Sequence, residues 1–172
     1  MQPSKHTELK SFLRECKSNR KNTEIIFLLQ NLDSAINVGH MFIIADAVVA
    51  TEIVLTGRTP KPGENDDITI TSMSNEQRID WVHFEKYEDG IEYVKKKGMQ
   101  LVSLEITPKS EDYKNVEYDD KVCILLGNET AGVYPYSLSR SDKIVHLPMY
   151  GKNYSLNVHV AAAILSYHIL NS

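Results

Sequence analysis

The sequence IVHLPMYGKNYSLNV at residues 144–158 combines the end of a strand, a glycine turn and the start of a helix. Its apolar and β-branched beginning predicts a strand over 144–149, which a proline brings to its end. Ser155 is positioned to cap a last helix over 155–170, with Asn157 on its first turn. Free backbone N–H groups at such a helix start suit an anionic ligand, although capping alone would also explain these residues.

Two further polar segments directly follow predicted strands. The segment NLDSAINVG at 31–39 comes after the apolar run at 25–29. The segment LLGNETAG at 125–132 continues an apolar strand at 122–126. Glycines allow a ligand to approach the backbone closely, and open α/β sheets bind ligands beyond the carboxyl ends of their strands. All three segments are therefore candidate parts of one binding site.

Neither of these two segments identifies a ligand on its own. Turn and capping chemistry explains residues 31–39 equally well. Residues 125–132 do not form a phosphate-binding P-loop, since no Lys-Ser/Thr pair follows the second glycine, and the chain has no GxGxxG motif. These absences count against a nucleotide-binding α/β protein unrelated to RNA.

The pattern of apolar residues predicts alternating strands and helices. Residues 57–80 are polar and contain prolines, with one strand-like piece at 68–70. Alternation of this kind predicts an α/β fold, with a mostly parallel sheet and helices on both faces. The predicted helices cover 7–20, 35–48, 88–97 and 155–170, and the predicted strands cover 25–29, 51–56, 101–106, 122–126 and 144–149.

Basic residues are concentrated at the N-terminus of this 172-residue chain. Residues 1–21 carry six Lys or Arg and two Glu, a balance of +4, so the remainder carries −8 of the total charge of −4. We therefore predict a basic N-terminal helix or arm over 1–22 and a single domain over 23–172. The arm could neutralise RNA phosphates, or it could be the solvated face of a helix that packs elsewhere.

Nothing in the sequence indicates a membrane, a secretory signal or a metal. No apolar run approaches 18 residues, and the N-terminus lacks the pattern of a signal peptide, so we expect a cytoplasmic protein. Cys16 and Cys123 are expected to be small buried side chains. No Cys or His residues have zinc-ligand spacing, and we expect no metal site.

Taken together, the three polar segments resemble the motifs of the SpoU (TrmH-like) RNA methyltransferases in order and separation. The family pattern is NxG after the first strand, LGNExxG in the middle and PMxGxxxSLNV near the C-terminus. Residues 31–39, 125–132 and 148–158 match it in turn. The resemblance extends over residues 24–170, and its third motif is highly specific.

The resemblance implies a SPOUT fold with a C-terminal trefoil knot, and a homodimer whose active sites are completed across the interface. It also implies RNA, either tRNA or rRNA, as the partner and S-adenosyl-L-methionine as the cofactor. The cofactor would contact Leu104, Glu105, Gly127, Leu147, Met149 and Leu156. The residues expected to line the place of the target ribose are Asn37, Glu129, Ser155 and Asn157.

One family residue is missing. The family usually methylates a ribose 2′-hydroxyl, a poor nucleophile that needs a base or a strong hydrogen-bond acceptor. An arginine six residues after the first-motif Asn is thought to help, but that position is Ile43 here. The following ADA at 45–47 matches the family, so the register is secure.

Three explanations for Ile43 stay open. Arg58, Arg78 or His159 could substitute for the arginine, although His159 could equally be a packed helix residue. Alternatively, the enzyme could methylate a different nucleophile. Finally, the chain could be a catalytically silent RNA-binding or assembly factor on the same fold.

Overall fold

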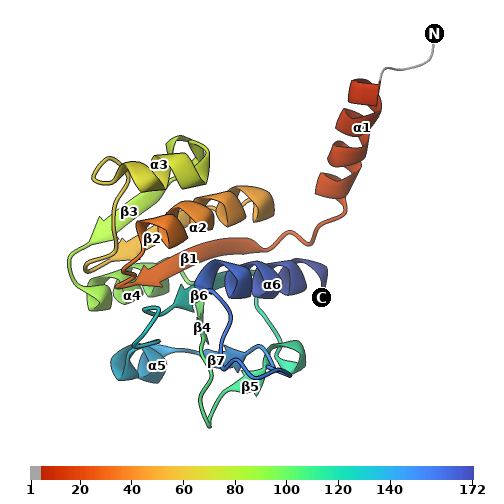
Figure 1. Ribbon diagram of the computed structural model, residues 1–172. Helices are drawn as coiled ribbons and strands as arrows, with labels where there is room; N and C mark the ends of the chain where they lie inside the picture. The colour runs from red at the N-terminus through yellow and green to blue at the C-terminus, as the bar shows by residue number, and fades with distance from the viewer. Residues whose placement is uncertain (1–4) are drawn as a thin grey trace.

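A seven-stranded sheet forms the centre of the computed structural model, which describes residues 5–172 (Figure 1). Across the sheet the strands follow the order β3-β2-β1-β6-β4-β7-β5, and all neighbouring strands are parallel. The predicted parallel sheet is therefore confirmed. The strands are β1 (Glu24–Gln30), β2 (Glu52–Thr56), β3 (Trp81–Phe84), β4 (Gln100–Leu104), β5 (Glu111–Asp112), β6 (Lys121–Leu126) and β7 (Lys143–His146).

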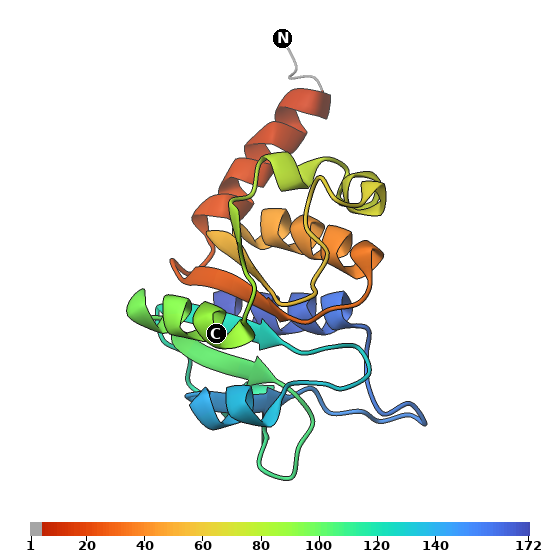
Figure 2. The ribbon, with the colours of Figure 1, turned by 90° about the vertical axis from the view of Figure 1, so that its left-hand side faces the viewer.

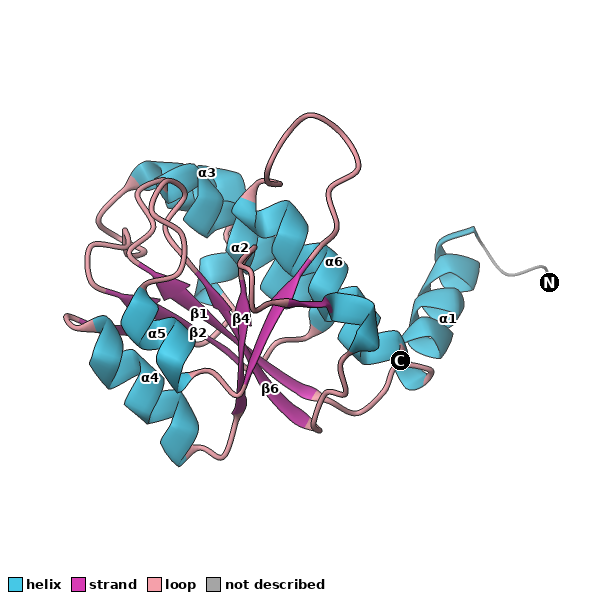
Figure 3. Ribbon diagram, turned by 90° about the horizontal axis from the view of Figure 1, so that it is seen from below, coloured by secondary structure: helices cyan, strands magenta, loops and turns pink. Residues whose placement is uncertain are grey.

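Helices cover both faces of the sheet, as predicted (Figure 3). Helices α2, α3 and α6 lie on one face, and α4 and α5 lie on the other. Short 3₁₀ helices are found at Asn75–Gln77 and Tyr113–Asn115. The α-helices are α1 (Lys5–Ser18), α2 (Ala35–Val48), α3 (Asp66–Ser72), α4 (Tyr87–Lys96), α5 (Pro135–Arg140) and α6 (Val158–Asn171).

Strand β1 explains why the central strands read as unbroken apolar runs. Its five apolar side chains alternate between two cores, and all five are fully buried. Ile25, Phe27 and Leu29 face the helices α2 and α6. Ile26 and Leu28 face α4 on the other side. A strand buried on both faces has no solvent-facing position to fill with a polar residue.

Helix α2 begins where the sequence predicts because Ser34 caps it. The Oγ atom of Ser34 accepts a hydrogen bond of 3.2 Å from the backbone N–H of Asn37. This cap fixes the first turn of α2 directly beyond the end of β1. Asn37 is thereby held at the carboxyl edge of the sheet, in the turn that the first polar segment was expected to form.

The strand-like piece predicted at 68–70 is wrong, since these residues lie in α3. Asn65 caps this helix by accepting a bond of 2.9 Å from the backbone N–H of Asp67, and two aspartates occupy its first turn. These capping interactions outweigh the β-propensity of so short a run. The sequence also did not reveal β3, an edge strand with exposed or half-buried residues, or the six-residue helix α5.

The last strand and helix are both shorter than predicted. Strand β7 ends at His146 rather than at 149, and α6 begins at Val158 rather than at 155. Asn157, not Ser155, occupies the N-cap position, and its side chain makes no capping hydrogen bond. The residues between β7 and α6 form a loop instead, which Figure 2 shows in blue reaching out from the body.

Helix α1 confirms the predicted N-terminal helix but not the burial of its apolar face. It projects away from the sheet, and Leu9, Phe12 and Cys16 are exposed (Figures 1 and 2). The expectation of a buried Cys16 is therefore wrong, whereas Cys123 is buried in β6, and its burial raises the pKa of the thiol. The arm's residues 1–4 lie outside the described part of the chain.

Arg20 ties the base of α1 to the body. Its guanidinium donates a bond of 2.6 Å to the carbonyl of Val48 at the end of α2, and one of 3.2 Å to the carbonyl of Thr23. The backbone N–H of Lys21 donates to the carbonyl of Leu170 at the end of α6. Within residues 5–172, no helix is both long and apolar enough to cross a membrane.

Candidate functional site

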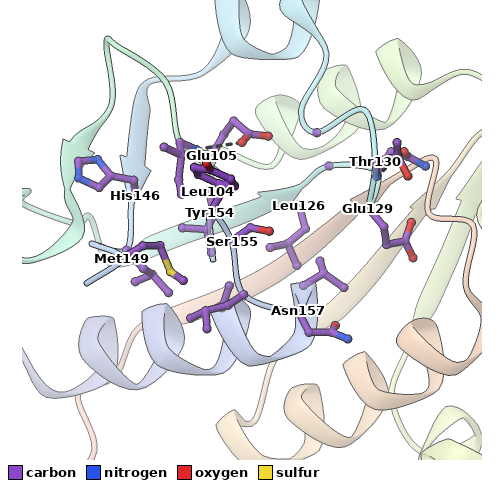
Figure 4. A pocket seen from close by; sticks show the side chains of 18 of the residues that line it. Leu104, Glu105, Leu126, Glu129, Thr130, His146, Met149, Tyr154, Ser155 and Asn157 are labelled. Atoms are coloured by element: carbon purple, nitrogen blue, oxygen red, sulfur yellow. Dashed lines mark hydrogen bonds between the residues drawn. The ribbon is translucent and has the colours of Figure 1, made fainter. Parts of the chain in front are cut away.

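A cavity of about 580 Å³ lies beyond the carboxyl ends of β4, β6 and β7, against the start of α6 (Figure 4). Leu104, Leu126 and His146, the last residues of these strands, line it. The volume falls within the range of small-molecule sites. The cavity wall includes all ten residues that the sequence singled out: Asn37, Leu104, Glu105, Gly127, Glu129, Leu147, Met149, Ser155, Leu156 and Asn157.

The two ends of the cavity differ in chemistry. Figure 4 shows Met149 and His146 at one end and Glu129 at the other, with Ser155 between them. Asn37 and Asn157 also line the cavity, and Asn37 is bonded to Glu129. One end can therefore enclose an apolar ring, while the other offers polar groups to a hydroxyl.

Gly127 allows the loop after β6 to fold back on itself. The backbone N–H of Asn128 donates to the carbonyl of Gly132 at 3.1 Å, and the N–H of Gly132 donates to the carbonyl of Asn128 at 2.8 Å. A Cβ atom on Gly127 would lie 2.2 Å from the backbone of Gly132 and Val133, which no side chain can tolerate. Gly132 has a φ of +68°, the left-handed region that favours glycine.

Glu105 connects the end of β4 to this loop. Its Oε2 accepts a bond of 2.7 Å from the backbone N–H of Val133, and its Oε1 accepts one of 2.9 Å from the N–H of Ile106. The carboxylate thus fixes two backbone segments of the cavity wall. The sequence singled out Glu105 only as a ligand contact, and this second role became visible in the fold.

The side chain of Glu129, a residue of the loop after β6, lies against the N-terminus of α2. Its carboxylate accepts hydrogen bonds from the backbone N–H groups of Asp33 and Ser34, at 2.9 and 3.1 Å, and from Nδ2 of Asn37 at 2.9 Å. Partial burial alone would raise the pKa of Glu129, but these bonds outweigh it, and the pKa is lowered. Glu129 therefore stays ionised near neutral pH, where it orients Asn37, and its lowered pKa makes it a weaker base than a free carboxylate.

This arrangement predicts a contribution of Glu129 to stability that depends on pH. Because its pKa is lower in the folded chain, the unfolded chain takes up the proton first as pH falls below the usual value of 4.5. The contribution is complete above that value and is lost at lower pH. We expect Glu129→Gln to lower the free energy of unfolding by about 0.5–1 kcal/mol at pH 6, and the difference to shrink at pH 3.5.

Urea unfolding at the two pH values measures this difference. Glu117→Gln is the matched control, since Glu117 is exposed and makes no hydrogen bond or ion pair in the described structure. It should unfold like the unaltered chain at pH 6. A difference for Glu129→Gln that grows at pH 3.5 would contradict the assigned hydrogen bonds.

Asp33 and Asn128 form a network beside Glu129 that the sequence did not reveal. Nδ2 of Asn128 donates to Oδ2 of Asp33 and to the carbonyl of Asn31, both at 2.8 Å. Arg58 pairs with Asp33 through its Nε atom at 2.7 Å. The network holds the loop after β6 against the start of α2. The only feature of the sequence that could have indicated this network is the position of Asp33 within the first polar segment, residues 31–39.

None of the side chains considered as substitutes for the missing arginine lines the cavity. Ile43 itself is half-buried on α2 and lies outside the cavity wall. Arg58 pairs with Asp33, and Arg78 donates to the side chain of Asn75. The positions of Arg58 and Arg78 within one chain therefore give no support to a role in removing the proton of the ribose hydroxyl.

His159 packs between helices instead. Its ring lies 4.4 Å from the ring of His40, measured between centroids, where α6 contacts α2. Burial, and then the proximity of His40, lower the pKa of His159. This position favours the interpretation of His159 as a packed helix residue over its interpretation as a catalytic base.

The imidazole that does line the cavity is that of His146, whose Nδ1 lies 3.0 Å from Oγ of Ser110.

Other residues complete the cavity wall. Sequence reasoning missed Ile106, Leu126, Asn128, Thr130, Gly132, His146, Tyr154, Val158 and Ala161. Most of them adjoin a predicted residue in the chain, and this adjacency was the available signal. Within residues 5–172, no three His, Cys, Asp or Glu side chains are grouped so that they could hold a metal ion.

Comparison with known proteins gives consistent matches. The model of the SpoU rRNA Methylase family matches residues 24–167. The tRNA (guanosine(18)-2′-O)-methyltransferase of Borreliella burgdorferi is 30% identical over 86% of this chain and 63% of its own length. The protein of the same name from Aquifex aeolicus is 30% identical over 90% of this chain and 72% of its own length.

A solved structure agrees with these matches. The AdoMet-bound rRNA methyltransferase from Sinorhizobium meliloti superposes with a TM-score of 0.77 and 28% identity. The superposition covers 85% of this chain and 55% of that one. The chain thus spans less than two thirds of the Borreliella protein and of this structure.

Proposed function

Because the chain belongs to the SpoU rRNA Methylase family, we propose that it is an S-adenosyl-L-methionine-dependent RNA methyltransferase acting on a ribose 2′-hydroxyl of tRNA or rRNA. The observation that carries the proposal is that one cavity is lined by all ten residues that the family resemblance implies. The names of the Borreliella and Aquifex relatives support the same reaction. A silent RNA-binding factor has in its favour only Ile43 and the net negative charge of the chain beyond its basic arm.

The residues present fit this cofactor. The cavity has the volume of a small-molecule site, and Leu104, Leu147 and Met149 can enclose an adenine ring. Gly127 lets the loop after β6 fold back on itself, and this loop forms part of the cavity wall. When bound, S-adenosyl-L-methionine would supply an electrophilic methyl group on a sulfonium centre.

The polar end of the cavity would align the target ribose. The side chains of Asn37 and Glu129 are hydrogen-bonded to each other, which fixes their orientation. The side chains of Ser155 and Asn157 make no hydrogen bond in the described structure, so their oxygen atoms are free to accept one from the 2′-hydroxyl. Alignment of the two reacting groups lowers the entropic part of the barrier, and a bond to the hydroxyl proton makes the oxygen a better nucleophile.

The remaining parts of the proposal concern assembly. We propose a homodimer, and an exposed apolar stripe on α6 formed by Val160, Ile164 and Tyr167 supports a partner copy there. Residues 1–22 would serve as a basic RNA-contacting arm, consistent with the projection of α1 from the body. The trefoil knot and a cytoplasmic location stay predictions.

Calorimetric titration with S-adenosyl-L-methionine tests the proposal without knowledge of the RNA target. We expect saturable binding by the unaltered chain, and roughly tenfold weaker binding by Leu156→Ala, because the variant loses apolar contact inside the cavity. Ile70→Ala is the matched control, since Ile70 is also exposed but lies on α3, outside the cavity wall. No detectable binding to folded protein would favour the silent RNA-binding alternative.

A further inference from the structure

We propose that Tyr150 and Tyr154, on the loop between β7 and α6, form a stacking surface for unpaired bases of the substrate RNA. The inference rests on the proposed function and extends it to the class of RNA bound. Tyr150 is 90% exposed and Tyr154 is 91% exposed. No other large apolar or aromatic side chain among those described is as exposed.

The two phenol rings have no partner among residues 5–172. Neither tyrosine makes a hydrogen bond or a ring contact in the described structure. Exposure of a large aromatic surface to water costs free energy, and such surfaces commonly mark a binding site. The loop that carries them, which we call the tyrosine loop (residues 148–157), extends from the body (Figure 2).

The tyrosine loop is continuous with the candidate site. Tyr154 lines the cavity and directly precedes Ser155, and Figure 4 shows the two side chains together. A nucleotide whose ribose reaches Ser155 and Asn157 would therefore pass Tyr154. Tyr150 is four residues earlier on the same loop and lies outside the cavity wall, where it can meet a neighbouring base.

At the tyrosine loop, charge favours stacking over phosphate contacts as the source of affinity. The chain has a net charge of −4, and the carboxylates of Glu105 and Glu129 line the cavity. Lys152, between the two tyrosines, is the only cation of the tyrosine loop. Unpaired RNA bases stack on exposed aromatic rings, whereas bases within a duplex are not accessible to them. The surface therefore fits a single-stranded loop rather than a helix.

A second copy of the chain is the alternative occupant. The apolar stripe on α6 is better suited to a protein partner because its exposed residues recur at helical spacing along one face of a helix. The tyrosine loop instead alternates its aromatic rings with Lys152, Gly151 and Asn153, a composition that matches bases and backbone phosphates. This contrast and the continuity with the cavity favour RNA.

Fluorescence anisotropy with two probes tests the inference. One probe is a labelled twelve-nucleotide oligoadenylate, and the other is a twelve-unit ribose-phosphate oligomer without bases. We expect the unaltered chain to bind the first more tightly than the second. Tyr150→Ala and Tyr154→Ala should each weaken oligoadenylate binding about tenfold, and the double variant should bind both probes equally. Tyr150→Phe should retain binding because its ring still stacks.

Salt dependence separates stacking from charge. Lys152→Ala should reduce the slope of log affinity against log salt concentration by about 0.7, the value for one phosphate contact on a single strand. The tyrosine variants should leave this slope unchanged. Tyr136→Ala is the matched control, since Tyr136 is 40% exposed on α5 and lies outside the cavity wall. It should bind both probes like the unaltered chain.

Three results would overturn the inference. The first is equal binding of both probes, or of neither, by the unaltered chain. The second is unchanged oligoadenylate binding by the folded double variant. The third is a dimer of the unaltered chain that sedimentation shows to dissociate in the double variant, which would assign the tyrosines to an interface between copies. Titration of the unaltered chain with S-adenosyl-L-methionine tests the proposed function separately.

Discussion

Replacement of Asn157 by alanine is expected to lower the rate of methyl transfer about 100-fold or more while leaving the fold and the proposed homodimer intact. Asn157 occupies the N-cap position of α6, yet its side chain makes no capping bond, so its loss should cost little stability. The same side chain lines the cavity beside Asn37 and Ser155. Loss of one positioned polar group at a reacting centre typically costs two to three orders of magnitude in rate.

Transfer of a radiolabelled methyl group from S-adenosyl-L-methionine to unfractionated tRNA or rRNA measures this effect. Asn153→Ala is the matched control, since Asn153 is an exposed side chain of the same loop that lies outside the cavity wall. It should transfer methyl groups at the unaltered rate. If Asn157→Ala keeps that rate as well, the assignment of the polar end of the cavity is wrong.

The buried strands could be predicted because the sheet is covered on both faces. Residues 25–29 and 122–126 are continuous apolar runs, and they became the central strands β1 and β6. At the edge of the sheet this signal disappears. In β3, Trp81 is exposed and the other three residues are only half-buried, so the strand contains no run that distinguishes it from a loop.

Helix α1 shows a different limit of sequence reasoning. Apolar residues at helical spacing correctly predicted the helix, but periodicity does not say whether a partner surface exists. Leu9, Phe12 and Leu13 are exposed, and so is Cys16. Packing is decided by where Arg20 and Lys21 attach the helix to the body, which no local pattern encodes.

The positions of the site residues could be predicted from motifs, but their bonding could not. Glu129 accepts hydrogen bonds from Asp33 and Ser34, which lie 96 and 95 residues away along the chain. These bonds keep the carboxylate ionised and fix its orientation, and they exist only once β1 and β6 are paired. The resemblance identified Glu129 as a site residue, and the fold assigns its hydrogen-bonding role.

Gly127→Ala is expected to abolish measurable binding of S-adenosyl-L-methionine. The added methyl group would lie 2.2 Å from the backbone of Gly132 and Val133, and backbone atoms cannot move aside as a flexible side chain can. The loop would have to open, breaking the two bonds between Asn128 and Gly132 and separating Val133 from Glu105. Overpacking of this kind costs about 1–3 kcal/mol of stability, so the melting temperature should fall by roughly 5 °C.

Gly151→Ala is the matched control for this prediction. Gly151 lies on the tyrosine loop, close in sequence to the cavity residues, but a Cβ atom there meets nothing within 4 Å. The control should therefore bind S-adenosyl-L-methionine in a calorimetric titration and melt like the unaltered chain. Folded Gly127→Ala that binds the cofactor with unaltered affinity would show that the loop after β6 is not part of the cofactor site. Loss of binding in this variant alone would instead show that the cofactor site needs the folded-back loop after β6. In that loop the backbone of Gly132 and Val133 lies so close to residue 127 that only glycine fits there.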